Sequence, residues 1–116
     1  MKRKFRLTRS TDFQRVRRLG KSYAHPLVVL IVLPSETDGL RCGIAASRSI
    51  GNAVKRNRAK RQMRAALHPL LDSIQPGWDM IILARRPIVG ATTDQIQKAI
   101  AGLLRRSRLL QEVNVN

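Results

Sequence analysis

Residues 52–71 of the chain read Asn52-Ala53-Val54-Lys55-Arg56-Asn57-Arg58-Ala59-Lys60-Arg61-Gln62-Met63-Arg64-Ala65-Ala66-Leu67-His68-Pro69-Leu70-Leu71, and they predict one long helix. Residues 47–52 contain several capping residues and a glycine, as expected where a helix begins. Pro69 is expected to kink or end the helix close to its C-terminus. Apolar residues recur at spacings of three, four and seven, the pattern of a helix face that packs on a core. This predicted buried face consists of Ala59, Met63, Ala66, Leu67 and Leu70.

The same helix is strongly basic. Residues 48–64 contain seven basic side chains and no acid: Arg48, Lys55, Arg56, Arg58, Lys60, Arg61 and Arg64. At about 100° per residue, Asn57, Lys60, Arg61 and Arg64 fall on one stripe beside the buried face. Like charges four residues apart destabilise an isolated helix by about 0.2–0.5 kcal/mol per pair. A merely solvated face is the alternative, but a run without any acid favours an anionic partner.

The composition of the whole chain points the same way. Its 116 residues hold 23 Lys and Arg against seven Asp and Glu, a formal net charge of +16. This length predicts one domain, residues 1–116, and 43% hydrophobic residues are enough for a core. A domain with so much positive charge is expected to bind a polyanion. Arginine outnumbers lysine 17 to 6, which favours phosphate recognition over a membrane surface.

Other features bound the location and the chemistry. No run of 18 apolar residues occurs, and no apolar segment typical of a signal peptide follows the basic N-terminus. We therefore expect no membrane partner and a cytoplasmic location. The one cysteine, Cys42, excludes an internal disulfide and a cysteine-based zinc site. It is expected to be a small buried residue in a strand.

The remaining segments predict helices packed on a small sheet, an α+β or split α/β class. Thr8, Ser10 and Thr11 are the candidate N-caps of the first helix, and Thr92 or Thr93 is the candidate for the last. The predicted elements are a helix over 12–19, a strand over 23–33, a turn over 34–39, a strand over 40–47 that completes a hairpin, a strand over 80–84 and a helix from about 92 to 110.

Residues 51–64 fit the pattern G-N-A-V-x-R-N-R-x-K-R-x-x-R at every fixed position. This segment closely resembles the signature of the bacterial ribonuclease P protein subunit. The resemblance extends over most of the chain: residues 6–7 with Asp12-Phe13 are similar to the family's first helix, Leu40-Arg41-Cys42-Gly43-Ile44 to one strand, and Gly77-Trp78-Asp79 to the start of a later strand.

The resemblance implies a fold. The family has a compact two-layer α-β sandwich, with a small, mostly antiparallel four-stranded sheet packed with helices. It also implies a left-handed βαβ crossover, placed before the basic helix, against the usual right-handed rule. Composition and periodicity alone do not predict that crossover.

The resemblance also implies a function. The family's protein binds a catalytic RNA and the 5′ leader of precursor tRNA, and it promotes endonucleolytic removal of the leader. The RNA subunit carries the catalysis with Mg²⁺ that is mainly RNA-bound. The partners implied are ribonuclease P RNA, in a 1:1 complex with a monomeric protein, and precursor tRNA.

Two sets of site residues follow from matching positions. The residues expected to contact RNA are Arg48, Asn52, Lys55, Arg56, Asn57, Arg58, Lys60, Arg61 and Arg64. Those expected near the leader cleft are Phe13, Arg17, Ile31, Arg85 and Arg86. Arg17 and Ile31 stand where relatives often carry aromatic residues, so this cleft has fewer rings on which bases can stack.

The protein alone is not expected to be a nuclease. A protein nuclease needs a positioned acid and base or paired metal-binding carboxylates. Of the seven acids only Glu36 and Asp38 are close in sequence, and they lie in a predicted turn. No protein-bound metal is expected. Two other readings are a structural RNA binder, such as a ribosomal protein, and a DNA regulator, which would need a supporting helix directly before residue 52.

Overall fold

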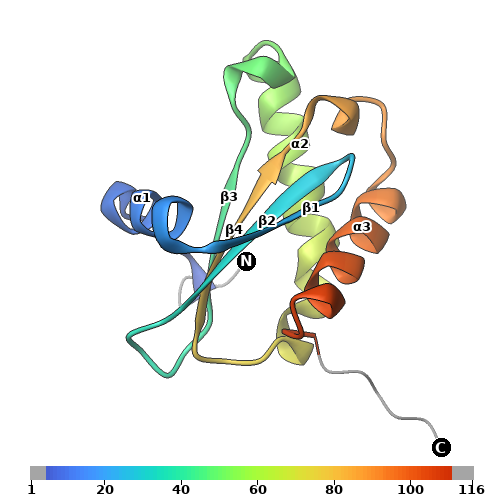
Figure 1. Ribbon diagram of the computed structural model, residues 1–116. Helices are drawn as coiled ribbons and strands as arrows, with labels where there is room; N and C mark the ends of the chain where they lie inside the picture. The colour runs from blue at the N-terminus through green and yellow to red at the C-terminus, as the bar shows by residue number, and fades with distance from the viewer. Residues whose placement is uncertain (1–4, 111–116) are drawn as a thin grey trace, which may run out of the picture.

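The computed structural model describes residues 5–110. It contains three α-helices, four strands and three short 3₁₀ helices (Figure 1). The first half of the chain forms α1 (Ser10–Leu19), β1 (Lys21–Ala24), β2 (Val28–Pro34), β3 (Arg41–Ala45) and η2 (Arg48–Ile50). The second half forms α2 (Ala53–Leu67), η3 (His68–Ser73), β4 (Trp78–Ala84), η4 (Arg86–Ile88) and α3 (Thr93–Arg106). The expected domain, 1–116, extends beyond these residues at both ends.

The four strands form one sheet in the order β1-β2-β4-β3. β2 pairs antiparallel with both β1 and β4, whereas β3 pairs parallel with β4. The sheet is thus mostly antiparallel, as expected. β4 lies in the interior of the sheet, and Met80, Ile81 and Ile82 at its centre are fully buried. A strand covered on both faces explains why this segment is continuously apolar.

The prediction of one strand over 23–33 is wrong. The chain reverses at residues 25–27, so β1 and β2 pair with each other, from Lys21 opposite Val32 to Ala24 opposite Val29. Pro26 has no N–H to donate and a fixed φ, which suits a turn better than a ladder. The His25 N–H donates to the Val28 carbonyl, and the Leu27 N–H donates to Nδ1 of His25.

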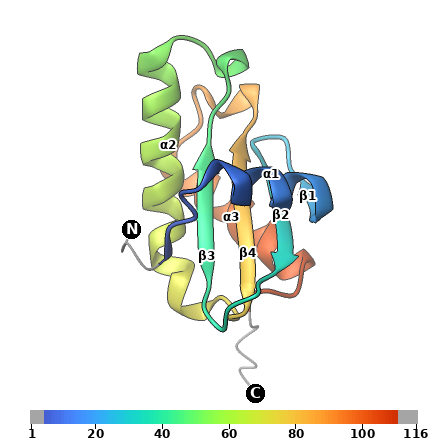
Figure 2. The ribbon, with the colours of Figure 1, turned by 90° about the vertical axis from the view of Figure 1, so that its left-hand side faces the viewer.

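The predicted hairpin between 23–33 and 40–47 is also wrong. β4 lies between β2 and β3, so β3 reaches its neighbour only through α2. Figure 2 shows β3 to the left of β4, with both strands running upward. Figure 1 shows α1 on one side of the sheet and α2 on the other, so α2 lies behind the sheet for the viewer of Figure 2. The β3–α2–β4 connection is therefore left-handed, as the resemblance implies. It contains the basic helix rather than preceding it.

The helices cover both faces of the sheet. α2 and α3 pack on one face, over Leu30, Met80 and Ile82, and this forms the larger core. The short α1 lies across the other face, where Val16 packs on Ile31 and Ile81 in a second, smaller cluster. A methyl group at Gly20, just after α1, would overlap the carbonyl of Val16 and the side chain of Ile31. Only a residue without a side chain therefore allows the tight turn from α1 into β1.

The helix ends differ in detail from the predictions. The Asn52 side chain caps α2 by accepting from the Lys55 N–H, but α2 ends at Leu67 and continues as η3, which contains Pro69. Thr92 caps α3 in a capping box with Gln95, and α3 ends at Arg106 rather than near 110. α1 has Arg9 as its N-cap residue without a side-chain cap, in place of Thr8, Ser10 or Thr11. The predicted buried face of α2 is confirmed for Ala59, Met63, Ala66 and Leu67, whereas Leu70 is half-buried in η3.

Candidate nucleic-acid interface

The exposed side of α2 carries a basic stripe. The side chains of Asn57, Lys60, Arg61 and Arg64, together with Val54, line a shallow hollow of about 500 Å³. We call these five residues the α2 stripe. The first four are the residues that the helical spacing places together, so that geometry is confirmed. Val54 was not predicted; it is 73% exposed and adds an apolar contact surface among the cations.

The other basic residues of the motif do not share that surface. Lys55 and Arg58 lie on another side of α2, where they line a small hollow with Val89 and Gly90 of the loop after η4. Arg48 is exposed on η2. The motif therefore presents cations on more than one side of the helix.

Two residues of the motif also have structural contacts. The Oδ1 atom of Asn52 accepts from the Lys55 N–H at 3.0 Å, so this side chain fixes the beginning of α2. Nη1 of the half-buried Arg56 donates to the Gly51 carbonyl at 2.9 Å. Gly51 has a φ of 138°, in the region that favours glycine. These contacts leave the amide N–H groups of Asn52 and the other N–H groups of Arg56 unused.

A second hollow lies where α1 meets the edge of β3. Its lining includes Thr8, Phe13, Gly43 and Arg64, and its volume is about 470 Å³. We call it the Phe13 hollow. The Phe13 ring packs on Gly43 so closely that a methyl group at Gly43 would overlap it. Because Arg64 also belongs to the α2 stripe, the stripe and the Phe13 hollow form a continuous surface.

A third hollow lies at the opposite end of α1. Arg17 and Arg85 line it with Val29 and Leu83, and its volume is about 330 Å³. We call it the Arg17 hollow. Ile31, by contrast, is 6% exposed and packs beneath α1, so this residue supports the helix and does not line these hollows. Arg86 is exposed on η4.

A buried carboxylate at the beginning of β4 anchors α1 on the sheet. Asp79 of β4 is fully buried and accepts hydrogen bonds from Arg15 Nη2 at 2.6 Å, Arg41 Nε at 2.9 Å and Arg41 Nη2 at 2.8 Å. Asp12 lies 3.6 Å from Arg15 and 3.5 Å from Arg41. Burial alone would raise the pKa of Asp79, but the bonds from Arg41 and Arg15 outweigh it and hold this pKa below its ordinary value. The hydrogen bond to Asp79 likewise raises the pKa of each arginine.

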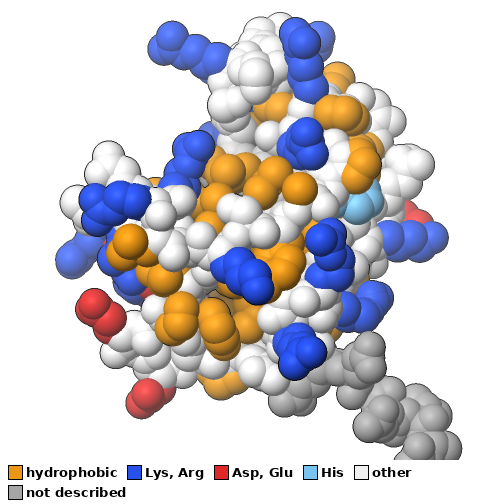
Figure 3. All heavy atoms as spheres, in the orientation of Figure 1, with side chains coloured by type: hydrophobic (Ala, Val, Ile, Leu, Met, Phe, Trp, Pro, Cys, Tyr) orange, Lys and Arg blue, Asp and Glu red, His pale blue; other side chains and the backbone are white. Residues whose placement is uncertain are grey.

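These ion pairs leave the α2 cations available. Within residues 5–110, Asp12 and Asp79 pair only with Arg15 and Arg41, and Asp94 pairs with Lys98 at 3.2 Å. No described acid pairs with a basic side chain of α2. Figure 3 views the molecule from the side of β1 and α3, with α2 behind, and that face also carries Lys and Arg side chains, with acids only near its margins. The basic surface is therefore free to bind an external anion.

The family is decided by comparison with known proteins. The model of the family described as ribonuclease P matches residues 1–108. This chain belongs to the ribonuclease P protein family. The "Ribonuclease P protein component" of Herpetosiphon aurantiacus is 45% identical over 109 residues, 94% of this chain and 89% of the relative. That of Listeria welshimeri is 39% identical over 97% of this chain and 95% of the relative.

Solved structures of ribonuclease P proteins have the same fold. The Staphylococcus aureus protein matches with a TM-score of 0.82 and 33% identity, over 92% of this chain and 98% of that one. The Thermotoga maritima protein matches with a TM-score of 0.78 and 26% identity, over 87% of this chain and 96% of that one. The likeness covers the whole arrangement of sheet and helices rather than the basic motif alone.

The neighbouring acids and the cysteine of the described residues have structural surroundings. Among residues 5–110, no group of three or more His, Cys, Asp or Glu is placed to hold a metal ion. Asp12 and Asp79, which approach the same arginines, are engaged by them and do not fit a magnesium site. Burial raises the pKa of the Cys42 thiol to about 12, so it is a poor nucleophile. In the same residues, no helix is long and apolar enough to cross a membrane.

Sequence reasoning missed the anchor of α1. Asp79 was noted as part of a family-like segment, but not as the partner of Arg15 and Arg41. A charged residue inside an otherwise apolar strand was the available signal, because a buried carboxylate needs partners. Which arginines supply them depends on contacts 38 and 64 positions away.

Proposed function

We propose that this chain holds ribonuclease P RNA on the α2 stripe and guides the 5′ leader of precursor tRNA along α1, through the Phe13 and Arg17 hollows. As a member of its family, the chain is the protein component of ribonuclease P, the ribonucleoprotein endonuclease that removes the 5′ leader of precursor tRNA. The observation that carries the proposal is the continuity of surface at Arg64, which lines both the α2 stripe and the Phe13 hollow.

The chemistry of the α2 stripe suits an RNA backbone. Guanidinium groups bind phosphate through two parallel N–H donors, and Asn57 adds an amide for a base edge or a 2′-hydroxyl. The stripe has no acid among its residues and lies beside a buried face that holds α2 rigidly on the core. Arg48, Asn52, Lys55, Arg56 and Arg58 extend this contact around the start of the helix.

The path along α1 suits a single strand held mainly by charge. Phe13 offers one ring, and each base stacked on an aromatic ring contributes about 1–3 kcal/mol. Beyond it, Arg17 and Arg85 offer guanidinium groups beside the apolar side chains of Val29 and Leu83. Arg86 lies next to Arg85 and adds charge at this end. The leader is therefore bound with strong salt dependence and little preference for sequence.

The rest of the assembly follows from this division of labour. The RNA subunit performs the cleavage and holds the Mg²⁺ ions, and the protein positions the substrate. One protein monomer, a single domain over residues 1–116, binds one RNA in the cytoplasm. The described acids are engaged in ion pairs or dispersed, which supports catalysis outside the protein.

The test is reconstitution with a bacterial ribonuclease P RNA at low Mg²⁺ concentration. We expect the chain to restore cleavage at the mature 5′ end, and to stimulate cleavage more for a precursor tRNA with a long leader than for one with a single leader nucleotide. Equal stimulation of both substrates would contradict the proposed leader path. Cleavage by the RNA-free chain would contradict the division of labour.

A further inference from the structure

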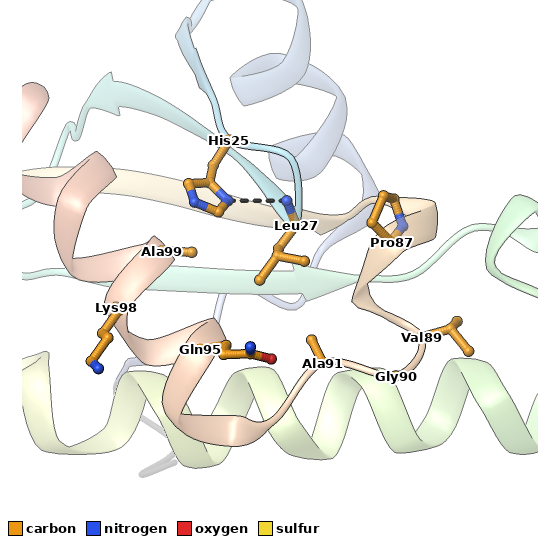
Figure 4. A pocket seen from close by; sticks show the side chains of 9 residues that line it. All are labelled: His25, Leu27, Pro87, Val89, Gly90, Ala91, Gln95, Lys98 and Ala99. Carbon is orange, nitrogen blue, oxygen red and sulfur yellow. Dashed lines mark hydrogen bonds between the residues drawn. The ribbon is translucent and has the colours of Figure 1, made fainter.

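A further hollow shares no lining residue with the α2 stripe, the Phe13 hollow or the Arg17 hollow. It has a volume of about 570 Å³ and is shown in Figure 4. The turn between β1 and β2 forms one side, and the loop after η4 with the first turns of α3 forms the other. We call it the His25 hollow. Ligand sites typically measure about 300–1,000 Å³, so one nucleoside fits this space.

The hollow has an apolar floor and two unused hydrogen-bond donors. Leu27 and Ala99 supply the floor, against which a base can pack. The Leu27 N–H donates to His25 Nδ1 at 3.0 Å, so the neutral ring carries its proton on Nε2. Gln95 Oε1 accepts from the Thr92 N–H at 2.9 Å, which leaves the side-chain NH₂ of Gln95 without a partner among residues 5–110. Both donors belong to residues that line the hollow, on its two opposite sides.

Guanidinium groups flank the turn that carries His25. Arg85 Nη1 donates to the His25 carbonyl at 3.3 Å, and Arg106 Nη1 donates to the Ala24 carbonyl at 3.1 Å. Each guanidinium has five N–H donors, so most remain available for a phosphate. Lys98 also lines the hollow, and its Nζ lies 3.2 Å from Oδ2 of Asp94. Both side chains are exposed, so this ion pair is weak and leaves Lys98 able to bind a phosphate.

The hollow is continuous with the basic side of α2. Val89 and Gly90 form part of its wall and also part of the small hollow that Lys55 and Arg58 line. Gln62 of α2 donates to the Ala91 carbonyl at 3.1 Å, which holds this loop against the helix. An RNA strand on Lys55 and Arg58 therefore reaches the hollow by crossing Val89, which is 46% exposed.

We propose that the His25 hollow binds one unpaired nucleotide of the RNA subunit, with its base on the apolar floor and its phosphate on Arg106. Proteins recognise RNA bases mainly where they are unpaired and can be turned out of the helix. The His25 and Gln95 donors then select a base with acceptors on its exposed edge. This inference rests on the proposed contact between α2 and the RNA subunit.

The first experiment measures affinity for a bacterial ribonuclease P RNA. Gln95→Glu keeps an oxygen for the Thr92 N–H and so preserves the cap, but it replaces the donor with a negative charge. We expect affinity to fall about tenfold, a loss of about 1.4 kcal/mol, with an unchanged melting temperature. Ser73→Glu is the matched control, because it adds the same charge on the exposed end of η3. Equal effects of the two variants would overturn the proposal.

A neutral variant separates this inference from the proposed function. His25→Asn keeps an acceptor for the Leu27 N–H but removes the ring and its Nε2 donor. We expect it to weaken RNA binding without changing the salt dependence, whereas Arg61→Ala lowers the salt dependence. If Arg61→Ala weakens binding but His25→Asn does not, the nucleotide site fails alone. If Arg61→Ala does not weaken RNA binding, the proposed function fails together with the nucleotide site.

The second experiment locates the RNA directly. Val89→Cys introduces an exposed thiol beside the hollow, and the native Cys42 is only 1% exposed with a pKa raised to about 12. A hydroxyl-radical source can therefore be attached selectively at position 89. We expect cleavage within one short unpaired segment of the RNA subunit in the complex. Dispersed cleavage, or cleavage of bound precursor tRNA instead, would overturn the proposal.

Discussion

The Asp79→Asn substitution tests how α1 is held on the sheet. The carboxylate accepts three N–H bonds, one from Arg15 and two from Arg41, and it is fully buried. An asparagine amide presents one oxygen and one NH₂ group. Whichever way it points, at least one guanidinium N–H faces another donor, and the two positive charges lose their counter-ion.

The size of the effect follows from burial. Removing one partner of a buried ion pair costs about 3–5 kcal/mol. The side chains of Arg15 and Arg41 are 24% and 29% exposed, so water solvates them partly after the substitution. We therefore expect the lower end, about 3 kcal/mol, which is a large fraction of the stability of a small domain.

The assay is equilibrium unfolding in urea, followed by circular dichroism. The midpoint should fall with an unchanged slope, because the folded state stays compact. Asp38→Asn is the matched control: Asp38 is exposed in the turn before β3 and forms no ion pair within residues 5–110. Its effect should stay within about 0.5 kcal/mol. Equal unfolding midpoints for Asp79→Asn and Asp38→Asn would refute the reasoning.

The pH dependence gives a second check on the same residue. The pKa of Asp79 lies below its ordinary 3.8, so the charged carboxylate stabilises the fold at neutral pH. This contribution is complete above the pKa of the unfolded chain and is lost as the pH falls through the lower pKa of the folded state. The difference in stability between the wild type and Asp79→Asn should therefore be constant near neutral pH and shrink below pH 3.8. A difference that grows in acid would contradict this sign.

Three further variants, each with its expected result, test the surfaces described above and the buried face of α2. The double substitution of Arg61 and Arg64 by Ala should weaken binding to ribonuclease P RNA and reduce the log–log salt slope by about 0.7–0.9 per lost phosphate contact, measured by filter binding. Met63→Asp should prevent folding because Met63 is fully buried, whereas Arg64→Asp should stay folded by circular dichroism. Gly43→Ala should displace the Phe13 ring of α1, lower the free energy of unfolding in urea by about 1–3 kcal/mol and weaken leader binding. Gly39→Ala should have none of these effects, because an added methyl group there meets no atom.

The basic helix was the part of the fold that sequence periodicity predicted best. Its beginning at about Asn52 and its buried residues, such as Met63, depend on local spacing, which the structure confirms. The strands were predicted less well, because strand order depends on contacts that sequence spacing does not contain. The turn at Pro26 was read as the beginning of a strand, and the apolar β4 was not placed between β2 and β3. The resemblance implied the left-handed crossover that periodicity could not supply.

The candidate surface shows the same division. Helical geometry alone placed Asn57, Lys60, Arg61 and Arg64 together, and the structure does so as well. Helical geometry could not show that Arg64 also lines the Phe13 hollow, because this depends on how α1 crosses the edge of β3. Nor could helical geometry show the His25 hollow, whose sides come from segments 60 to 74 positions apart.

The described arginines differ in whether a carboxylate pairs with them. Arg15 and Arg41 are paired with carboxylates and hold the fold together, whereas the cations of α2 have no acid partner among residues 5–110. Repulsion along α2 therefore lowers the stability of the free protein. The proposed RNA backbone on the α2 stripe would remove that repulsion, and RNA that binds only the folded chain would stabilise it by mass action. We therefore expect the same unpaired charges that weaken the isolated domain to strengthen the proposed complex, and to couple folding of the protein to binding of its RNA.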